Sequence, residues 1–501
     1  MMAQTNAPGS AEKKPGISLE AIAAGVGGQI VGDPSMVVTG ITHDSRQVES
    51  GWLFACIRGA TVDGHNFAAT AVQAGAGALL VDHVVDVAVP QIMVDDVRAA
   101  TGLAAAKVYG DPSTKLTVVG VTGTNGKTTI VEMLAAVWTQ AGRSAKVIGT
   151  LTGPRTTPEG PDLHRQLAQW SDEGVELVAI EVSSHSLELA RVAGVQFACV
   201  AFTNLGRDHL DFHHDMESYF AAKAKLFAPA FSSRAVINRD DPFGQRLYEQ
   251  VAAGQEHEAV AYGLDDAYDG DYGAEGSQFT WQGQQISLRS PGLHNVSNAL
   301  AAANIAAMLG LSPEMVARGL SAAGPVRGRF EIVPGDQPFT VAVDYAHTPD
   351  ALAAVLATGR EVSQGRVIVV FGCGGDRDRE KRPEMGRVAA ENAEVVVVTS
   401  DNPRSEDPRT IVEEILVGVH EAVASQKRVP ESSRQKPVAE VKVDLDREKA
   451  ITWAVAAAQA GDLVVIAGKG HETTQVTGST ESRFDDAEVA TAALANVKAN
   501  V

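Results

Sequence analysis

The sequence predicts an α/β protein built around parallel sheets, and two observations carry this prediction. Apolar runs rich in β-branched residues alternate along the chain with alanine-rich stretches of helical periodicity, which is the pattern of strands covered by helices. The chain has 501 residues. This length is too great for one hydrophobic core and, at about 150 residues per domain, it indicates about three domains.

Turn-rich segments place the domain boundaries. The segment "GDPSTK", residues 110–115, has turn chemistry and no periodicity, and a new series of strands begins after "RGRFE". We therefore expect the following division: a disordered tail over 1–15, an N-terminal domain over 16–114, a central domain over 115–330 and a C-terminal domain over 331–501.

Each domain has its own series of expected elements. In the N-terminal domain we expect strands within 36–48, 51–57, 77–82 and 91–96, and helices within 66–76 and 97–110. The central domain is expected to hold strands within 118–122, 145–150, 175–185, 197–205 and 234–241. The C-terminal domain is expected to hold strands within 339–347, 366–376, 393–403 and 462–472.

Composition excludes several classes of partner. The chain has 42 Lys and Arg against 62 Asp and Glu, a formal net charge of −20, which repels nucleic acid. Its three cysteines are scattered and form no CxxC pair, as expected in a reducing compartment. The first fifteen residues have no apolar leader pattern, and no run approaches 18 apolar residues. We expect a cytoplasmic monomer without a membrane span.

The stretch "VVGVTGTNGKTTIVEML", residues 118–134, predicts a phosphate-binding loop. A β-branched run leads into glycines and then into a helix that begins near Lys127. Backbone N–H groups of such a loop, together with the positive end of the helix dipole, bind phosphate. Lys127 is expected to reach the β- and γ-phosphates, Thr128 to offer its hydroxyl to Mg²⁺, and Thr129 to line the same turn.

Glu181 is a candidate magnesium ligand. It ends the apolar strand of "LVAIEVSSH", where a carboxylate can bind the ion that Thr128 also touches. The alternative is a solvated glutamate that merely follows a strand.

Lys223 lies on an apolar helical stripe. From Met216 on, Tyr219, Lys223, Leu226 and Phe227 fall at helical spacing, whereas Lys225 points away from the stripe. A lysine in that position either extends to solvent or loses its charge, and a neutral amine can react with CO₂ to form a carbamate, an oxygen ligand for a hard cation.

Three histidines precede this helix. His209 is either a metal ligand or a loop histidine, and the sequence leaves both readings open. His213 and His214 are expected to face solvent.

Four polar loops follow the expected strands of the C-terminal domain: "DYAH", "GCGGDRDR", "SDNPR" and "GKGHE". In open parallel sheets ligands bind beyond the carboxyl ends of the strands, so these loops should converge on a second binding site. Its candidate polar residues are Asp344, His347, Arg377, Asn402, Arg404 and Glu472.

Ten motifs, in this order, resemble the Mur ligase family: "GTNGKTT", "EVSSH", "TNLGRDHLDFH", "AAKAKLF", "LHNVSNALAA", "GRFE", "DYAHTPDAL", "FGCGGDRDREKRPEMG", "DNPR" and "GKGHE". With "ITHDSR" in the N-terminal domain, the resemblance spans nearly the whole chain. Residues 1–15 and 425–438 lie outside it. It implies a central P-loop ATPase-like domain and a C-terminal α/β domain that resembles dinucleotide-binding domains.

The resemblance implies an ATP-dependent ligase that forms an amide. Such an enzyme phosphorylates a substrate carboxylate, and the amine of an incoming amino acid attacks the acyl phosphate. The implied substrates are ATP, a UDP-N-acetylmuramoyl dipeptide and meso-diaminopimelate, and the implied cofactors are two Mg²⁺ ions, with CO₂ to carbamylate Lys223. The catalytic residues by this resemblance are Lys127, Glu181, His209 and Lys223.

Each ligand is assigned its residues by the same resemblance. Thr128 and Glu181 hold one metal ion, and His209 with carbamylated Lys223 holds the other. The ATP site comprises Gly123, Thr124, Asn125, Gly126, Lys127, Thr128, Thr129, Asn295, Arg329 and Asp344. The UDP-sugar site comprises Ser45, Arg46, Thr156, Thr157, Ser183 and Arg191. The meso-diaminopimelate site comprises Arg377, Asp401, Asn402, Pro403, Arg404, Gly468 and Glu472.

Two features shape these expectations. An arginine and a hydroxyl, as at Ser45 and Arg46, suit a pyrophosphate. Leu189 stands where relatives often carry glutamine, and "RTTPEG" differs from some relatives' version of that loop.

Arg404 is the expected specificity residue. Its planar guanidinium can pair bidentately with the carboxylate that meso-diaminopimelate has and lysine lacks, and it would repel lysine's ammonium. Glu472 suits the distal ammonium, and Arg377 the other carboxylate. The alternative is that Arg404 merely pairs with Glu406 or Asp407.

Two other functions remain as alternatives. Folylpolyglutamate synthetases share "GTNGK", but their P-loop usually continues Gly-Ser, and they would not explain "HDSR" or "DNPR". A nucleotide-dependent switch needs no carbamate lysine, and the sequence lacks the Asn-Lys-x-Asp signal of guanine binding.

Overall fold

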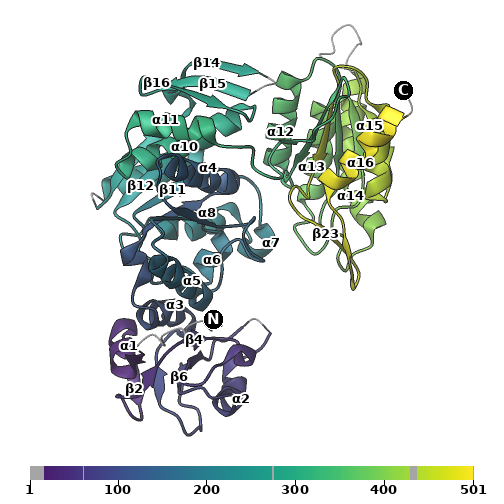
Figure 1. The fold of residues 1–501 in the computed structure, drawn as a ribbon. Coiled ribbons are helices and arrows are strands. Elements are labelled where there is room, and N and C mark those ends of the chain that lie inside the picture. The colour runs from purple at the N-terminus through teal and green to yellow at the C-terminus, as the bar shows by residue number, and fades with distance from the viewer. Residues whose placement is uncertain (1–15, 60, 255, 274–275, 429–436, 500–501) are drawn as a thin grey trace, which may run out of the picture. The chain divides into compact units, whose positions relative to one another are not determined.

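A computed structural model describes residues 16–59, 61–254, 256–273, 276–428 and 437–499 (Figure 1). The expected tail over 1–15 and most of the segment 425–438 lie outside these residues. Contacts divide the chain into two compact units. Unit 1 comprises the described residues up to Thr117 together with Thr157–Glu176 and His185–Phe197, and unit 2 comprises Val118–Thr156, Leu177–Ser184 and the chain from Ala198 on.

Unit 1 is built on a five-stranded sheet of order β2-β7-β6-β5-β4, in which only β2 is antiparallel to its neighbour. The strands are β2 (Gln29–Val31), β4 (Ile41–Thr42), β5 (Leu53–Ala55), β6 (Ala78–Val81) and β7 (Gln91–Met93), and a further pair is β1 (Ile17–Ser18) with β3 (Val37–Val38). Strand side chains alternate between two cores. Leu53 and Ala55 pack with α1 (Leu19–Val26) and α3 (Val97–Val108), whereas Phe54 packs with α2 (Ala68–Gln73).

The expected strands and helices of the N-terminal domain are present, and α1 and β2 were not predicted. Unit 1 also takes in α5 (Gly160–Asp172), which packs against α3. Gly102 of α3 lies so close to the 185–197 segment that a Cβ there would stand 2.6 Å from the carbonyl oxygen of Ala193. These contacts connect two central segments to the first 117 residues.

Unit 2 contains a six-stranded, fully parallel sheet of order β13-β12-β11-β8-β10-β9. Its strands are β8 (Thr117–Thr122), β9 (Ala145–Ile148), β10 (Leu177–Glu181), β11 (Cys199–Phe202), β12 (Arg234–Asn238) and β13 (Glu258–Tyr262). The helices that follow these strands include α4 (Lys127–Gln140), α6 (Ser184–Glu188), α7 (Leu210–His213), α8 (Met216–Ala224) and α9 (Pro242–Ala253). The five strands expected here are confirmed.

An antiparallel meander that the sequence pattern did not predict follows β13. It consists of β14 (Tyr268–Gly273), β15 (Gly276–Trp281) and β16 (Gln284–Leu288). Its inward side chains Phe279, Trp281 and Ile286 join one core with α4, α10 (Leu293–Met308) and α11 (Pro313–Ala322). The meander therefore covers helices instead of extending the parallel sheet.

The second large sheet of unit 2 has the order β17-β18-β22-β19-β20-β21, with only β17 antiparallel. Its strands are β17 (Glu331–Ile332), β18 (Thr340–Asp344), β19 (Val367–Phe371), β20 (Val395–Val398), β21 (Glu440–Val443) and β22 (Leu463–Ala467), and a hairpin of β23 (Thr474–Thr477) and β24 (Thr480–Arg483) follows. The four strands predicted here are confirmed.

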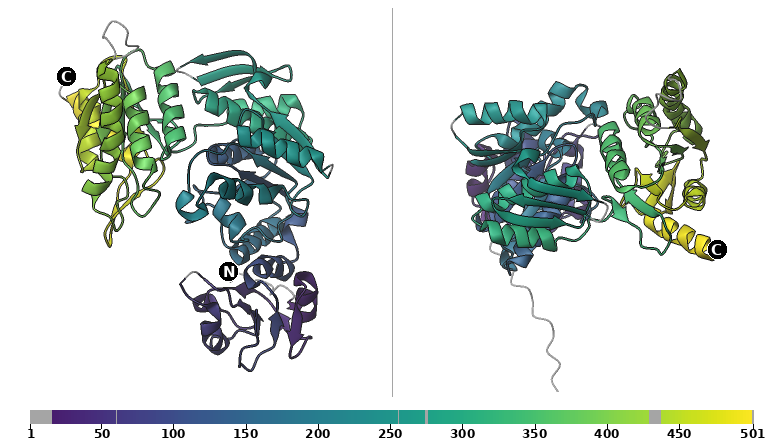
Figure 2. Two further views of the ribbon diagram at one scale, coloured as in Figure 1. Left: turned by 180° about the vertical axis from the view of Figure 1, so that it is seen from behind. Right: turned by 90° about the horizontal axis from the view of Figure 1, so that it is seen from above.

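Helices cover both faces of this sheet (Figure 2). Val369 and Phe371 pack with one set of helices, and Ile368 and Val370 with the other. The first set is α12 (Pro349–Val362), α13 (Lys381–Asn392) and α14 (Pro408–Arg428), and the second is α15 (Arg447–Ala457) and α16 (Asp486–Ala499). A strand buried on both faces must be apolar at every position, which explains "VIVVF" and "VVVV".

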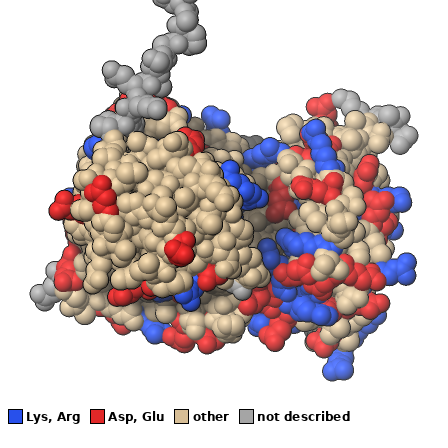
Figure 3. Space-filling model, turned by 90° about the horizontal axis from the view of Figure 1, so that it is seen from below, with Lys and Arg blue, Asp and Glu red and all other residues tan. Residues whose placement is uncertain are grey.

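The charged side chains on the surface and the three cysteines can be compared with what the composition predicts. On the face in Figure 3, the Lys and Arg side chains stand among Asp and Glu side chains. Cys56, Cys199 and Cys373 are all buried and unpaired, and burial raises the pKa of each thiol to about 12. In the part of the chain that the structure describes, no helix combines the length and the apolar character needed to cross a bilayer.

A buried ion pair ties the second sheet to the C-terminal helix. The guanidinium of Arg447 binds Asp486 at 2.7 Å, and both side chains are fully buried. Its Nη1 and Nη2 also donate to the carbonyl oxygens of Ser400 and Ala467, the residues just before the "DNPR" and "GKGHE" loops. Arg447 thereby fixes the starting points of both loops.

Arg447→Met should lower the free energy of unfolding by about 3 kcal/mol or more, because it leaves Asp486 buried without a partner. Thermal unfolding with and without denaturant measures the change. The matched control is Arg387→Ala, which breaks the half-exposed pair with Glu391 and should cost under about 0.5 kcal/mol. Equal losses in the two variants would contradict this reading.

Candidate active site

The loop between β8 and α4 has the form of a phosphate cradle. Gly123 has φ +146°, and a Cβ on it would stand 1.8 Å from Thr203 Oγ1. Gly126 has φ +88°, and its Cβ would stand 2.3 Å from Asn298 Oδ1. Only glycine fits at both positions, since the backbone is left-handed and the neighbours are in contact. Helix α4 begins at Lys127, so its positive end faces the loop.

Two lysines converge on this loop. Lys127 Nζ donates to the carbonyl oxygens of Gly123 at 2.8 Å and Thr124 at 2.7 Å. Lys223 Nζ donates to the same Gly123 oxygen at 2.8 Å and lies over the Tyr219 ring. The two ammonium groups therefore compete within one buried pocket.

Burial lowers the pKa of both lysines. It lowers the pKa of Lys127, although Glu181 and Asp208 oppose the shift. It holds the pKa of Lys223 well below its ordinary value, and the charge of Lys127 adds to the effect. Lys223 does not extend to solvent, because only 1% of the residue is exposed, whereas Lys225 is exposed as predicted. Lys223 is thus an unusual amine that favours the neutral form.

Glu181 is buried at the end of β10, so the alternative of a solvated glutamate is wrong. Thr128 Oγ1 donates to its Oε2 at 3.0 Å, and Thr150 N donates to its Oε1 at 2.8 Å. Arg329 Nη2 in turn donates to Thr128 Oγ1 at 2.9 Å. The hydroxyl and the carboxylate therefore lie together as expected, and their oxygens suit a hard cation.

His209 lies beside a buried carboxylate. Its Nε2 is 3.3 Å from Asp208 Oδ2, and His347 Nε2 is 3.6 Å from the same oxygen. Although burial alone would raise the pKa of Asp208, His209, His347 and Lys381 hold it well below its usual range. Asp208 thereby connects the "GRDH" loop with "DYAH", a link that the separate motifs did not reveal.

The prediction that His213 faces solvent is wrong. His213 is buried, its ring packs on Tyr219, and its Nε2 lies 2.9 Å from Ser184 Oγ. It falls on the inner side of the short helix α7, where a ring nitrogen can meet a hydroxyl. His214, the next residue, is exposed as predicted.

A cavity of about 490 Å³ opens at the P-loop. Asn295, Arg329 and Asp344 line it together with the loop, as their expected nucleotide role requires. Asp344 accepts from the N–H groups of Phe330 and Ala346 at 2.7 Å, and burial raises its pKa. The other lining residues named by the sequence are Thr124, Asn125, Gly126, Lys127, Thr128, Thr129, Thr156, Glu181, Ser183, His209 and His347.

The polar loops of the second sheet meet at its carboxyl edge, as predicted. Asn402 Nδ2 donates to Glu472 Oε2 at 2.7 Å. Lys469, which is fully buried, lies 3.5 Å from Glu472 and 4.0 Å from Asp401. Gly468, with φ +114°, lets the chain turn here, and Pro403 approaches Gly375 so closely that a Cβ there would stand 1.8 Å from its carbonyl oxygen.

Arg404 is half-buried and its Nη1 donates to the carbonyl oxygen of Gly375 at 2.7 Å. The alternative ion pairs are not formed in the described residues: Glu406 pairs with Arg382, and Asp407 accepts from the N–H of Arg409. Arg377 is exposed and donates to the carbonyl oxygen of Asp376. Arg404 is therefore held in place through a neutral group, with no carboxylate bound to it.

The expected UDP-sugar residues fall in both units. Ser45 and Arg46 follow β4, and Arg46 binds Asp44 at 2.7 Å, which lowers the pKa of Asp44 to about 2. In unit 1, Arg191 Nη1 donates to the Thr157 carbonyl oxygen at 3.4 Å. Thr156 and Ser183 belong to unit 2 and line the large cavity.

Three supporting residues escaped the sequence analysis. Asn204 Oδ1 accepts from the N–H of Asn125, and Thr203 Oγ1 donates to the Asn125 carbonyl oxygen. Thr150 binds Glu181. Asn204 and Thr203 could have been found from the expected topology, because parallel pairing of β11 with β8 places residues 203–204 beside the P-loop.

Three family models match the chain. They are the Mur ligase family catalytic domain over 37–109, the Mur ligase middle domain over 121–306 and the Mur ligase glutamate ligase domain over 328–470. A UDP-N-acetylmuramoyl-L-alanyl-D-glutamate–2,6-diaminopimelate ligase from Geobacillus kaustophilus is 42% identical over 493 residues, which cover 92% of this chain and 96% of that protein.

Solved structures agree with these matches. A structure of a UDP-N-acetylmuramoyl-L-alanyl-D-glutamate–2,6-diaminopimelate ligase has a TM-score of 0.67 and 31% identity, covering 96% of this chain and 99% of its own. The Mycobacterium tuberculosis folylpolyglutamate synthase complexed with ADP and AMPPCP has a TM-score of 0.58 over 79% of this chain and 93% of its own. At 18% identity it shows a shared fold alone.

Gly126→Ala should weaken ATP binding by roughly tenfold or more, because its Cβ collides with Asn298 and strains the cradle. Gly142→Ala is the matched control. It lies just after the same helix with φ +75°, but a Cβ there meets nothing within 4 Å. Calorimetric titration with ATP and thermal unfolding separate the two effects, and equal ATP affinity in both variants would refute a cradle at Gly126.

Proposed function

Because this chain belongs to the Mur ligase family, we propose that it joins meso-diaminopimelate to the D-glutamate of UDP-N-acetylmuramoyl-L-alanyl-D-glutamate, with ATP cleaved to ADP and phosphate. The reaction makes a peptidoglycan precursor in the cytoplasm. The observation that carries the proposal is the pairing of a P-loop cradle with a second polar site at the carboxyl edge of the other sheet, in a chain 42% identical to a ligase of that name.

Activation of the carboxylate explains the phosphate cradle. A carboxylate oxygen is a poor leaving group. The γ-phosphoryl group of ATP is therefore first transferred to the substrate carboxylate, which gives an acyl phosphate and ADP. The α-amine of the amino acid then attacks the carbonyl carbon, the C–N bond forms, and phosphate leaves. Lys127, above the loop carbonyls, is placed to bind the β- and γ-phosphates, and Arg329 and Asp344 line the same cavity.

The donor set at Thr128 and Glu181 fits Mg²⁺, since a hydroxyl and a buried carboxylate oxygen lie 3.0 Å apart. A magnesium ion bound there would neutralise the negative charges of the phosphates and of the substrate carboxylate, which otherwise repel each other. Thr150 and Arg329 keep these two donors in place.

The burial of Lys223 supports its proposed carbamylation. Its neutral amine can form an N–C bond with CO₂, and the proton released goes to solvent. The carbamate is anionic, so it removes the conflict with Lys127, and its oxygens join His209 as donors for a second Mg²⁺. The motivation is the lowered pKa together with the shared Gly123 carbonyl.

Substrate selection rests with Arg404 and Glu472. The Arg404 guanidinium is held on one side by its hydrogen bond to the Gly375 carbonyl oxygen. Bidentate pairing with a carboxylate is the strongest further interaction that such a group makes. Glu472, positioned by Asn402, suits the distal ammonium of meso-diaminopimelate. Arg377, Asp401, Pro403 and Gly468 complete this proposed site.

The UDP-sugar is proposed to bind Ser45 and Arg46 of an N-terminal domain over 16–114, and Thr156, Thr157, Ser183 and Arg191 to contact the muramoyl peptide. The central domain over 115–330 then carries ATP, with Asn295 at the adenine, and the C-terminal domain over 331–501 carries the amino acid. The protein is proposed to act as a monomer without nucleic acid.

The proposed function is tested by ADP formation in a matrix of substrates. Steady-state ADP formation over many turnovers should require both UDP-N-acetylmuramoyl-L-alanyl-D-glutamate and meso-diaminopimelate. Formation with a folate and glutamate instead would establish the folylpolyglutamate alternative. Hydrolysis that needs neither substrate would establish a nucleotide switch.

Lys223→Ala should lose most ligase activity and regain part of it when short-chain carboxylates are added, because these can replace the missing oxygen donor. Lys225→Ala, two residues on and exposed, should retain activity and gain nothing from the carboxylates. Steady-state assays at several formate and acetate concentrations measure both. Equal activity of the two variants would rule out a catalytic carbamate.

Arg404→Ala should raise the KM for meso-diaminopimelate by about a hundredfold, because a lost partner of a buried charge pair costs about 3 kcal/mol. The KM for ATP should stay nearly unchanged. Arg409→Ala, exposed and five residues on, is the control. If the wild type used L-lysine as well as meso-diaminopimelate, Arg404 would not read the extra carboxylate.

A further inference from the structure

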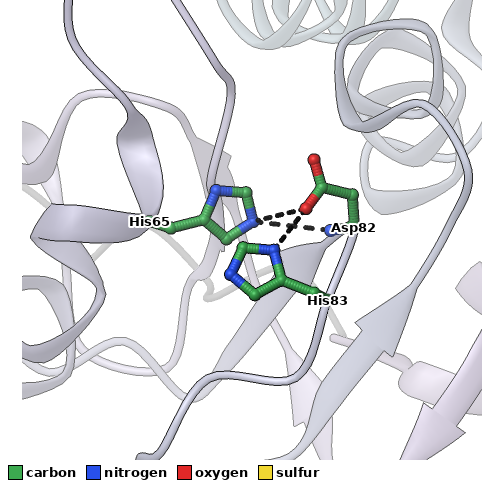
Figure 4. Close-up of side chains that lie close together, drawn as sticks. All are labelled: His65, Asp82 and His83. Carbon is green, nitrogen blue, oxygen red and sulfur yellow. Dashed lines mark hydrogen bonds and ion pairs between the residues drawn. The ribbon is translucent and has the colours of Figure 1, made fainter.

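Two histidines and an aspartate of unit 1 point at one another (Figure 4). His65 Nε2 lies 3.4 Å from Asp82 Oδ1, and His83 Nδ1 lies 2.5 Å from the same oxygen. The two imidazole rings are stacked with centroids 4.3 Å apart. One ligand atom from each residue lies within 4.8 Å of the others, which is the spacing of a metal site.

The fold brings these residues together from two neighbouring strands. Asp82 and His83 follow β6, and His65 lies in the short helix η2 (Gly64–Phe67) after β5, which pairs in parallel with β6. The cluster therefore sits at the carboxyl edge of the sheet, where open parallel sheets bind ligands. None of its residues is among those assigned to the reaction proposed above, whose Ser45 and Arg46 follow the neighbouring strand β4.

A carboxylate orients His65. Asp63 Oδ1 is 2.7 Å from His65 Nδ1, and the Asp82 N–H lies 3.4 Å from His65 Nε2 on the opposite side of the ring. With its proton on Nδ1 toward Asp63, His65 accepts the Asp82 N–H at Nε2, and the same lone pair is the one that an ion would use. Metal-binding histidines are typically held in this way by a carboxylate behind the ring.

Arg58 is the group that competes for this site. Its guanidinium binds Asp82 Oδ2 at 2.8 Å and also lies 3.4 Å from His83 Nδ1 and 3.8 Å from Asp63 Oδ2. The Arg58 side chain is 59% exposed, so it can turn into solvent without breaking the core. The Arg58 guanidinium is attracted to Asp82 and Asp63, so the electrostatic potential beside these carboxylates favours a positive charge.

We propose that His65, Asp82 and His83 bind one divalent transition-metal ion of the zinc class. Ligand atoms about 2.0–2.1 Å from a tetrahedral ion lie about 3.3 Å apart, which the His65–Asp82 spacing already meets. The half-exposed His83 ring would move outward from its short contact and bind through Nδ1 in the tautomer that carries its proton on Nε2. The fourth position stays open to water.

The ion would fasten the β5–η2 connection to the end of β6. Borderline ions such as Zn²⁺ bind imidazole well, whereas Mg²⁺ prefers oxygen donors and its own water, so this site and the proposed magnesium sites select different metals. The full-length chain would bind this ion whether or not a nucleotide is present.

Titration of the full-length protein with Co²⁺ in excess Mg²⁺ tests the proposal. The wild type should develop the visible absorption of a tetrahedral nitrogen-ligated ion at one equivalent, and Zn²⁺ should abolish it. His83→Ala should remove this absorption and leave ligase activity unchanged, while His214→Ala, another exposed histidine, should leave it intact. No absorption in the wild type, or an unchanged spectrum in His83→Ala, would overturn the proposal.

Two further variants probe the neighbours. Arg58→Gln should tighten Co²⁺ binding, because it removes the cation that competes for Asp82. Asp63→Asn should weaken it by roughly tenfold, the usual loss when the group behind a ligating histidine is changed. A cluster that is only an ion-pair network predicts the opposite for Arg58→Gln, namely loss of order without gain of metal affinity, and that result would also refute the site.

Discussion

Two lysine ammonium groups share one buried carbonyl oxygen, that of Gly123, and the chemistry of unit 2 depends on this contact. Two like charges close together in a desolvated pocket destabilise each other, which favours the neutral form of one amine or the arrival of a counter-charge. Glu181 and Asp208 support the charge of Lys127 against Arg329, whereas Asp208 supports the charge of Lys223 and Lys127 opposes it. The asymmetry agrees with the proposed roles, in which Lys127 contacts phosphate and Lys223 is the reactive amine.

The P-loop and the parallel strands were predictable because each depends on local pattern. The apolar stripe placed Lys223 on the buried face but left open whether its amine extends to solvent. Glycines at a strand-to-helix turn, continuous apolar runs and a lysine on an apolar stripe all leave a mark in adjacent residues. The convergence of the C-terminal loops was predictable for the same reason, since parallel strands deliver their ends to one edge.

Features set by long-range packing were not predictable. His213 looked like a surface histidine because its partners, Ser184 and Tyr219, are brought to it by other elements. The meander β14–β16 has the pattern of any hairpin, and nothing local says that it covers α10 and α11. The assignment of Thr157–Glu176 and His185–Phe197 to unit 1 arises from the approach of Gly102 to Ala193, which only the fold reveals.

The three buried thiols have a practical consequence. Burial raises the pKa of each thiol to about 12, and maleimides react with exposed thiolates. We therefore expect native Cys56, Cys199 and Cys373 not to react with such reagents in the folded protein. Surface cysteines introduced one in each unit could carry a donor and an acceptor dye without prior removal of any natural residue, so that changes in distance during turnover become observable in single molecules.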